Sequence, residues 1–313
     1  MKKFMYAALV AMIGLAFQNN ANAQETLLGL DDANNIVSVQ SNSPTIATIS
    51  PIVGLEAGDN LVGIDFRSGN GQLYAIGSAN NVYTLDLTTF VPSLVGNFAD
   101  GINDDPANVG GLSGNQFAFD FNPALTTAGQ PTGSFARIIS DTDVNRVISG
   151  NTGEYLGAEK TNVFYDTGDT NDGANPNIQG IAYTNSDFRP TSTQQYGLDL
   201  DQNALVTVAN NAGTLATVGG FGNIFTGEAG FDISGVTDVA YATFDSGLGV
   251  LGTGDSELYT IDLGTGAATL VGGFGANNNI RSLAVVGAAV PEPGSASLLA
   301  LGLVALAGRR RRK

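Results

Sequence analysis

Two short apolar segments of the sequence each carry a pair of polar side chains. Asp65 and Arg67 form the first pair, and Asp120 and Asn122 form the second. Side chains two residues apart lie on the same face of a β-strand, so each pair can be presented to one surface. Carboxylate and amide groups gathered there would bind a sugar or a cation, and two carboxylates at a suitable separation would hydrolyse a glycosidic bond. The structural alternative is that Arg67 only neutralises the carboxylates and that Asn122 only turns the chain.

Two other acidic clusters contain the residue types of calcium sites. The segment 141–145, Asp-Thr-Asp-Val-Asn, starts like a calcium loop, but Arg146 stands where that loop needs Gly and Thr152 where it needs Glu. The second cluster has three carboxylates spaced three residues apart: Asp166, Asp169 and Asp172. Exposed turns have the same composition of Asp, Asn and Gly, so we interpret both clusters as turns.

The remaining composition gives little support for catalysis. The 313 residues include no His and no Cys, which removes the commonest general base, the commonest transition-metal ligand and any disulfide. No nucleophile elbow, phosphate-binding loop or zinc signature occurs. We therefore predict no catalytic residues, no metal site and no cofactor. Two alternatives stay open: a carbohydrate hydrolase or lyase that uses the carboxylates above, and a calcium-binding surface module.

The chain between the two ends is strongly acidic. Residues 24–290 hold 28 acidic residues against six basic ones, a net charge of −22. Phosphate binding needs a cationic face, so nucleic acid is not an expected partner. Acidity of this size instead favours solubility.

The N-terminus has the organisation of a secretory signal peptide. Lys2 and Lys3 precede an apolar run over residues 6–17, and Ala21 and Ala23 form a small-x-small cleavage site. The apolar run is shorter than the roughly 18 residues of a spanning helix, which disfavours the alternative of a membrane anchor. We predict a signal helix in residues 1–23 and a mature chain that starts near Gln24.

The C-terminus combines three features in a fixed order. Pro291, Glu292 and Pro293 come first, an apolar run over residues 296–307 follows, and the basic cluster 309–313 ends the chain. This order resembles the PEP-CTERM sorting signal of exopolysaccharide-producing bacteria, which a membrane protease, exosortase, recognises and processes. The resemblance implies that residues 290–313 are a sorting segment with an apolar helix that enters the membrane. A plain C-terminal anchor is the alternative.

An internal repeat organises the residues between these signals. Residues 258–274 match residues 82–98 without gaps at nine of seventeen positions. Each copy contains two short strands rich in β-branched and aromatic residues, joined by a turn that Asp262 is expected to stabilise. Larger units of four such strands recur over residues 61–98, 112–166, 178–219 and 236–271, the size of a propeller blade. The last strand of the second unit is expected at residues 163–165, and the first two strands of the fourth unit at residues 236–241 and 248–252.

The remaining strands predict how the ring closes. Residues 27–49 supply three strands, and residues 280–286 supply the missing one. Pairing strands from both termini would remove exposed sheet edges. We therefore predict one all-β domain over residues 24–289, a propeller of five four-stranded blades, or six if residues 104–177 contain two. A β-sandwich is the competing fold.

The first strand of each blade is expected to line the central channel. One ring of side chains is then Asp65, Asp120, Ala182, Ala240 and Ala284. The next ring is Arg67, Asn122, Thr184, Ala242 and Val286. Polar residues fall on two neighbouring blades only, so Asp65, Arg67, Asp120 and Asn122 are the candidate ligand-binding residues.

Several segments resemble one bacterial family. They are Asp65-Phe66-Arg67, residues 119–123, 137–141 and 173–176, Ala182–Asn185, and residues 258–262 with Thr265-Gly266. Together they are similar to domain of unknown function family 4394, over roughly residues 27–286. The resemblance implies an exported protein and supplies no activity. We expect a non-enzymatic structural or adhesive protein of the cell envelope or extracellular matrix, in contact with exopolysaccharide, and exosortase as a processing partner.

Overall fold

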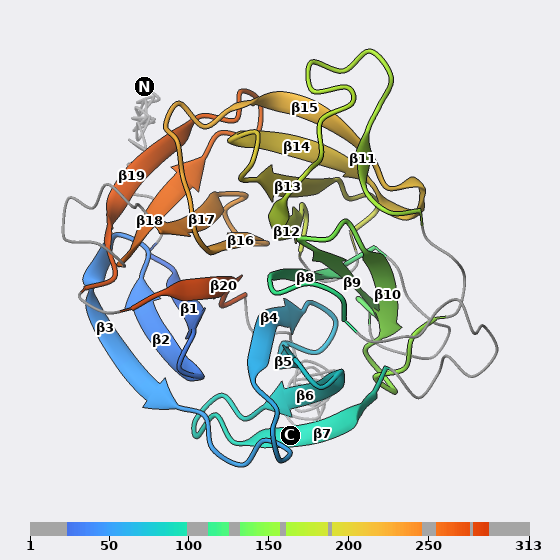
Figure 1. Ribbon diagram of the computed structural model, residues 1–313. Helices are drawn as coiled ribbons and strands as arrows, with labels where there is room; N and C mark the ends of the chain where they lie inside the picture. The colour runs from blue at the N-terminus through green and yellow to red at the C-terminus, as the bar shows by residue number, and fades with distance from the viewer. Residues whose placement is uncertain are drawn as a thin grey trace, which may run out of the picture.

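The computed structural model describes residues 24–98, 112–124, 132–156, 161–186, 190–245, 255–275 and 278–287. These residues form five sheets, antiparallel except for one strand pair in blade 4, arranged around a central axis as a five-bladed β-propeller (Figure 1). Their one helical element is the short 3₁₀ turn η1 (Asn210–Ala212). None of the described helical structure has the length and apolarity to cross a membrane. The predicted signal helix and C-terminal helix lie outside the described residues.

The blades follow one another along the chain, and in each the first-named strand is innermost (Figure 1). Blade 1 contains β20 (Ile280–Val285), β1 (Thr26–Asp31), β2 (Asn35–Gln40) and β3 (Ser43–Pro51). Blade 2 contains β4 (Leu61–Arg67), β5 (Gln72–Gly77), β6 (Asn81–Leu85) and β7 (Pro92–Asn97). Blade 3 contains β8 (Phe117–Asn122), β9 (Phe135–Ser140) and β10 (Asn145–Ser149). Blade 4 contains β12 (Ile178–Tyr183), β13 (Gln195–Asp199), β14 (Ala204–Ala209), β15 (Thr214–Gly220) and β11 (Phe164–Tyr165). Blade 5 contains β16 (Ala229–Ile233), β17 (Ala240–Asp245), β18 (Ser256–Ile261) and β19 (Ala268–Gly273).

The two ends of the domain close the ring, as predicted. β20 pairs antiparallel with β1, with Leu27 opposite Val285. Glu25 extends this closure to the neighbouring blade, because its carboxylate accepts hydrogen bonds from the hydroxyls of Ser234 and Tyr241 in blade 5. β20 thus covers the inner edge of β1 and completes blade 1 as a four-stranded sheet.

The internal repeat corresponds to the last two strands of blades 2 and 5, and the two copies use the same turn. Asp86 Oδ1 accepts hydrogen bonds from the backbone N–H and hydroxyl of Thr89, at 2.8 and 2.9 Å. Asp262 Oδ1 accepts the equivalent bonds from Thr265, at 2.8 and 3.0 Å. These side-chain bonds lower the pKa of both exposed carboxyl groups. Asp262 thus stabilises a turn, as the sequence predicted.

Two strand predictions are wrong. Residues 236–241 were expected to be the inner strand of blade 5, but residues 234–239 form a turn, closed by a hydrogen bond from Ser234 N to Val239 O. Asp238 in this turn has φ of 59°, a left-handed conformation that no strand contains. The inner strand is β16, which precedes the turn. The expected second strand, residues 248–252, lies outside the described residues.

The second error concerns β11, which was expected to complete blade 3. It pairs instead with β15 of blade 4, in parallel orientation, with Tyr165 opposite Leu215. The Tyr165 hydroxyl donates a 2.6 Å hydrogen bond to Asp199 of the same blade. Blade 3 is left with three strands in the part of the chain that the structure describes, and Tyr155 makes an isolated bridge to Ile148 of β10.

Small residues allow the inner strands to lie close together. Each inner strand has a small residue at the same position: Gly63, Ala118, Gly180, Gly230 and Ser282. A Cβ atom on Gly180 would lie 2.6 Å from Phe231 Cβ, and one on Gly230 would lie 2.7 Å from Leu283 N. Both distances are shorter than any normal contact, so these two positions require glycine. The close approach makes the channel narrow.

Candidate functional site

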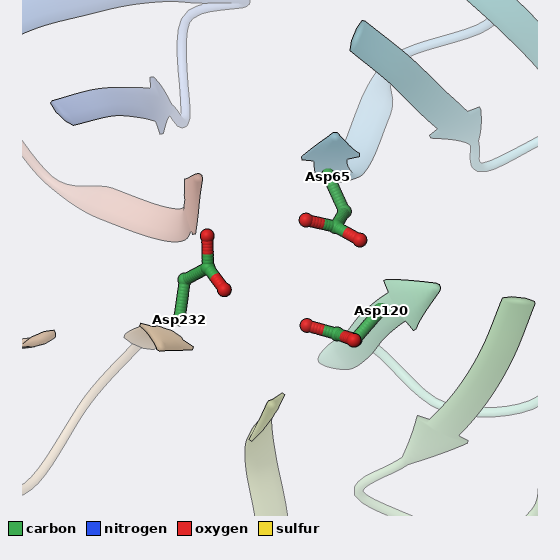
Figure 2. Close-up of side chains that lie close together, drawn as sticks. All are labelled: Asp65, Asp120 and Asp232. Atoms are coloured by element: carbon green, nitrogen blue, oxygen red, sulfur yellow. The ribbon is translucent and has the colours of Figure 1, made fainter. Parts of the chain in front are cut away.

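Three carboxylates meet in the central channel. Asp65 on β4, Asp120 on β8 and Asp232 on β16 point toward a common space between the inner strands (Figure 2). One carboxylate oxygen from each lies within 4.8 Å of the others. The three residues are only 5, 2 and 4% exposed. The channel therefore holds a compact acidic cluster that solvent hardly reaches.

A shared strand pattern places these side chains at one level. Each inner strand has a small residue, then an apolar one, then the channel-facing residue: Gly63-Ile-Asp65, Ala118-Phe-Asp120, Gly180-Ile-Ala182, Gly230-Phe-Asp232 and Ser282-Leu-Ala284. Side chains alternate along a strand, so the third residue of each triplet lies in the same ring. Three blades supply Asp and two supply Ala.

The carboxylates differ in their hydrogen bonds. Asp65 Oδ2 accepts a 2.7 Å hydrogen bond from the N–H of Phe121 on the neighbouring inner strand. Asp232 Oδ2 accepts a 2.6 Å hydrogen bond from the N–H of Val285, also one blade away. Asp120 also accepts a backbone hydrogen bond, from Tyr183 on the next inner strand, but its Oδ1 is buried and has no partner among the described residues. Figure 2 shows an Asp120 oxygen turned toward the space that the three side chains share.

Burial and mutual repulsion raise the pKa of all three groups. Desolvation is the largest cause for each. The charge of Asp232 raises the pKa of Asp65 further, and the charges of Asp65 and Asp232 raise that of Asp120. The pKa of Asp232 rises to about 7, with Glu25 as the neighbouring charge. Three ionised carboxylates in this space would be strongly unfavourable without a bound cation or proton.

The structure brings together two of the four predicted ligand residues. Asp65 and Asp120 are both in the cluster, whereas Arg67 lies to one side, where its guanidinium donates hydrogen bonds to Asn151 Oδ1 (2.8 Å) and Ser134 Oγ (3.3 Å). Asn122 Oδ1 accepts a 3.1 Å bond from the N–H of Ala124, which is the turn role given as its alternative.

Asp232 is the site residue that the sequence analysis missed. The misplaced inner strand of blade 5 put Ala240 in the ring instead. The triplet Gly230-Phe-Asp232 matches Gly63-Ile-Asp65 in spacing, and aligning the repeats on that small residue would have found it.

The other acidic clusters lie in turns. Asp141 accepts a hydrogen bond from the N–H of Asn115, and Asp143 has φ of 66° in the turn between β9 and β10. In the loop after β11, Asp169 accepts bonds from the N–H and hydroxyl of Thr217, at 2.7 and 2.6 Å. Asp172 accepts one from Gly168 N at 2.9 Å. These contacts use the carboxylates to hold the loops.

A polar pocket of about 490 Å³ lies over the outer strands of blade 4. Its polar lining residues are Asp166, Thr193, Gln194, Gln195, Thr207, Asn210 and Thr214. Gln195 is 1% exposed, and neither its Nε2 nor its Oε1 has a hydrogen-bond partner among the described residues. An amide buried without partners costs about 1–3 kcal/mol, so this side chain is poorly satisfied in the free protein.

The sequence matches one family model over most of its length. The model is that of a domain of unknown function, DUF4394, and it covers residues 35–284. The chain belongs to the DUF4394 family. The family name carries no activity, and no curated protein matches this DUF4394 chain.

A second model matches the C-terminal end. Residues 289–312 fit the PEP-CTERM protein-sorting motif, which includes the predicted Pro291, Glu292 and Pro293. The DUF4394 chain is therefore an exported protein that exosortase processes, and its C-terminal segment associates with the membrane. The motif and the predicted signal cleavage site at Ala21 and Ala23 lie outside the described residues.

Several solved structures resemble the DUF4394 propeller distantly. One is a protein of unknown function from Bacteroides thetaiotaomicron, with 11% identity and a TM-score of 0.46 over 85% of this chain and 66% of that chain. A chain of a nidogen/laminin complex has 12% identity and a TM-score of 0.44 over 83% of this chain and 98% of that chain. Hydrazine synthase of Kuenenia stuttgartiensis has 13% identity and a TM-score of 0.39 over 69% of this chain, which spans half the length of that protein. Similarity this low carries no functional argument.

Proposed function

We propose that this protein is a non-enzymatic component of the cell envelope or extracellular matrix that binds exopolysaccharide through the pocket on blade 4. The observation that carries the proposal is the Gln195 amide, which lines a polar pocket and lacks hydrogen-bond partners among the described residues. Because this side chain is 1% exposed, we infer that the amide turns toward the pocket to meet its ligand, whereas backbone hydrogen bonds hold Asp65 and Asp232 of the channel in place. A sugar hydroxyl both donates and accepts hydrogen bonds, so one or two hydroxyls can satisfy Nε2 and Oε1 together.

The size and chemistry of the pocket support a carbohydrate ligand. A volume of about 490 Å³ is within the roughly 300–1,000 Å³ of small-molecule sites. The hydroxyls of Thr193, Thr207 and Thr214 and the amide of Asn210 add further donors and acceptors. The acidic surface of the exported part favours a neutral polysaccharide over an anionic one.

The same geometry argues against hydrolysis of that ligand. Glycosidases use a pair of carboxyl groups, and Asp166 alone among the described lining residues carries one. The channel carboxylates are close enough to resemble a retaining pair, but they are 2–5% exposed. The neighbouring cavity, lined by Phe119, Ile181 and Phe231, measures about 10 Å³, room for roughly one water molecule. A sugar ring does not fit there.

Affinity electrophoresis through gels that contain exopolysaccharide from the producing cells tests the proposal. The native protein should be retarded, and Gln195→Leu should lose at least about tenfold in affinity, the equivalent of one or two hydrogen bonds. Gln72→Leu, which changes an exposed glutamine on β5, is the matched control and should bind normally. Equal retardation of Gln195→Leu and the native protein would overturn the proposal. Release of reducing ends during the incubation would refute its non-enzymatic part.

A further inference from the structure

The acidic cluster in the channel has the geometry of a coordination sphere. Calcium binds oxygen ligands at roughly 2.3–2.6 Å, so two ligands on opposite sides of the ion lie up to about 5 Å apart. The three carboxylate oxygens of Asp65, Asp120 and Asp232 lie within 4.8 Å of one another. Ligands of magnesium, at roughly 2.0–2.1 Å, span only about 4 Å. Separations within 4.8 Å admit either ion. Calcium is the better fit because it accepts several carboxylate ligands in irregular geometry, whereas magnesium usually keeps most of its water ligands.

The hydrogen bonds leave ligand capacity at the centre. Asp65 and Asp232 each accept a backbone hydrogen bond through Oδ2, which fixes their carboxylates in place. Asp232 Oδ1 also accepts one from Ile233 N at 2.6 Å, but a carboxylate oxygen has two lone pairs, so it can still coordinate an ion. Asp120 Oδ1 is buried without a partner among the described residues, and Asp120 itself is 2% exposed. A buried polar atom without a partner is uncommon and calls for an explanation such as an ion. This atom belongs to the side chain that Figure 2 shows directed into the cluster.

The charges around the cluster also favour a cation. The charged groups that act on the three carboxyls are other carboxyls, namely each other and Glu25. Two arginines lie on the same strands or opposite them, and both make hydrogen bonds elsewhere. Arg67 on β4 donates to Thr132 O, Ser134 Oγ and Asn151 Oδ1. Arg137, opposite Asp120 on β9, donates to the Tyr183 hydroxyl, Asn145 Oδ1 and Asn211 Oδ1. Because the chain contains no His and no Cys, the donor set is oxygen only, which suits a hard divalent ion.

We propose that Asp65, Asp120 and Asp232 bind a Ca²⁺ ion in the central channel, where it joins the inner strands of blades 2, 3 and 5. The ion neutralises the carboxylates and satisfies Asp120 Oδ1. Its role is structural, because the site is buried and lies between blades. Binding then stabilises the closed ring, since a site assembled from three separate strands does not exist in the unfolded chain.

The test uses the full chain after removal of metal with EDTA. Addition of about 1 mM CaCl₂, the range in which extracellular calcium modules bind, should load one ion per chain by elemental analysis. It should also raise Tm by roughly 5 °C, and the same concentration of MgCl₂ should raise it less. No bound calcium together with an unchanged Tm would overturn the proposal.

Variants locate the ion. Asp120→Asn and Asp232→Asn keep the shape of the side chain and remove its charge, so both should lose the bound calcium and the Tm shift. Asp172→Asn, in the loop after β11, is the matched control and should keep both. If Asp172→Asn loses the shift and the channel variants keep it, the ion is in the loop and the proposal is wrong. If a channel variant does not fold, the metal content of Asp172→Asn decides: one calcium per chain supports the channel site, and loss of the ion overturns it.

Discussion

The carboxylate of Asp65 accepts a 2.7 Å hydrogen bond from the backbone N–H of Phe121, and this bond joins the inner strands of two neighbouring blades. Asp232 makes the equivalent contact to Val285 at 2.6 Å, between blades 5 and 1. The same side chains that form the acidic cluster therefore also connect the blades. These two roles favour different forms of the carboxyl group. The hydrogen bond to the backbone favours the ionised form, whereas repulsion between the crowded carboxylates favours the protonated form.

Substitution of Asp65 should separate these roles. Asp65→Ala removes the acceptor and leaves the Phe121 N–H buried, which should lower the free energy of unfolding by about 1–3 kcal/mol in EDTA. Asp65→Asn keeps an oxygen acceptor and removes the charge, so it should be at least as stable as the native protein under the same conditions. Urea unfolding with EDTA present measures both. A loss in Asp65→Asn equal to that in Asp65→Ala would mean that the negative charge itself is required.

Replacement of Gly230 should disrupt the packing between blades 5 and 1. A Cβ atom there would lie 2.7 Å from Leu283 N, which is backbone and cannot turn aside. We expect Gly230→Ala to lower the free energy of unfolding by about 2–3 kcal/mol, as overpacking does. Gly220→Ala is the control, because its nearest atom, Asn203 O, would be 3.7 Å away. Thermal and urea unfolding measure both variants, and the control should have nearly the stability of the native protein. Equal stability of the two variants would contradict the conclusion that only glycine fits at position 230 beside the backbone of β20.

Gln195 should show a trade-off between stability and binding. Both polar atoms of its amide are buried without partners, so Gln195→Leu removes an unsatisfied group at nearly the same volume. The variant should unfold at a higher temperature by a few degrees, the effect of about 1 kcal/mol. Its affinity for exopolysaccharide should fall at the same time. A lower Tm would show that the free protein satisfies the amide in some other way.

The five-bladed architecture could be predicted from the sequence because strands and turns have recognisable local sequence patterns, and because the incomplete units at the two ends indicated how the ring closes. The repeat of residues 82–98 in 258–274 identified the outer strands of blades 2 and 5, and the unpaired strand 280–286 predicted that β20 would complete blade 1. The sequence predicted that Asp65 and Asp120 face the channel, because both lie on strands correctly predicted to be innermost. It did not predict Asp232, because residues 236–241 have the composition of a strand and therefore indicate the inner strand of blade 5, although the chain turns there.

The sequence did not predict which segments far apart along the chain would be in contact. The parallel pairing of β11 with β15 is made by backbone hydrogen bonds from Phe164 N to Gly213 O and from Asp166 N to Leu215 O, and nothing in either segment indicates the other. The hydrogen bonds of Arg67 to residues of the β9 and β10 loops are of the same kind, since they depend on how blades 2 and 3 pack. The pocket beside Gln195 likewise arises from the outer strands of blade 4 together with the segment after β11.

The sorting motif gives a prediction that is independent of the channel. Replacement of Pro291, Glu292 and Pro293 by alanine should abolish processing by exosortase, because the PEP-CTERM motif covers these residues. Mass spectrometry of the released native protein should show a shortened C-terminus, and the variant should stay unprocessed. Cells that lack exosortase are the control and should behave like the variant. Release of an unshortened native protein from normal cells would contradict the prediction.

The raised pKa values of the channel carboxyls predict an unusual dependence of stability on pH. A carboxyl group in an unfolded chain has a pKa of about 3.9, whereas burial raises the pKa of Asp65, Asp120 and Asp232, the last to about 7. Between these values the folded protein binds more protons than the unfolded chain. Stability in EDTA should therefore be greatest near pH 4 and fall as pH rises toward 7, by up to about 1.4 kcal/mol per pH unit for each group.

Calcium should reverse this trend if it binds the same carboxyls. The ion requires the ionised forms, so binding tightens as pH rises and offsets the loss of stability. Urea unfolding at pH values from about 4.5 to 7.5, with EDTA or with calcium, gives the two curves. Asp232→Asn should flatten the EDTA curve, because it removes one titrating group and one source of repulsion. The exposed turn carboxyls Asp86 and Asp262 have lowered pKa values and act only at lower pH, so they do not mask the effect. A native EDTA curve that rises between pH 4.5 and 7 would contradict the burial of protonated carboxyls in the channel.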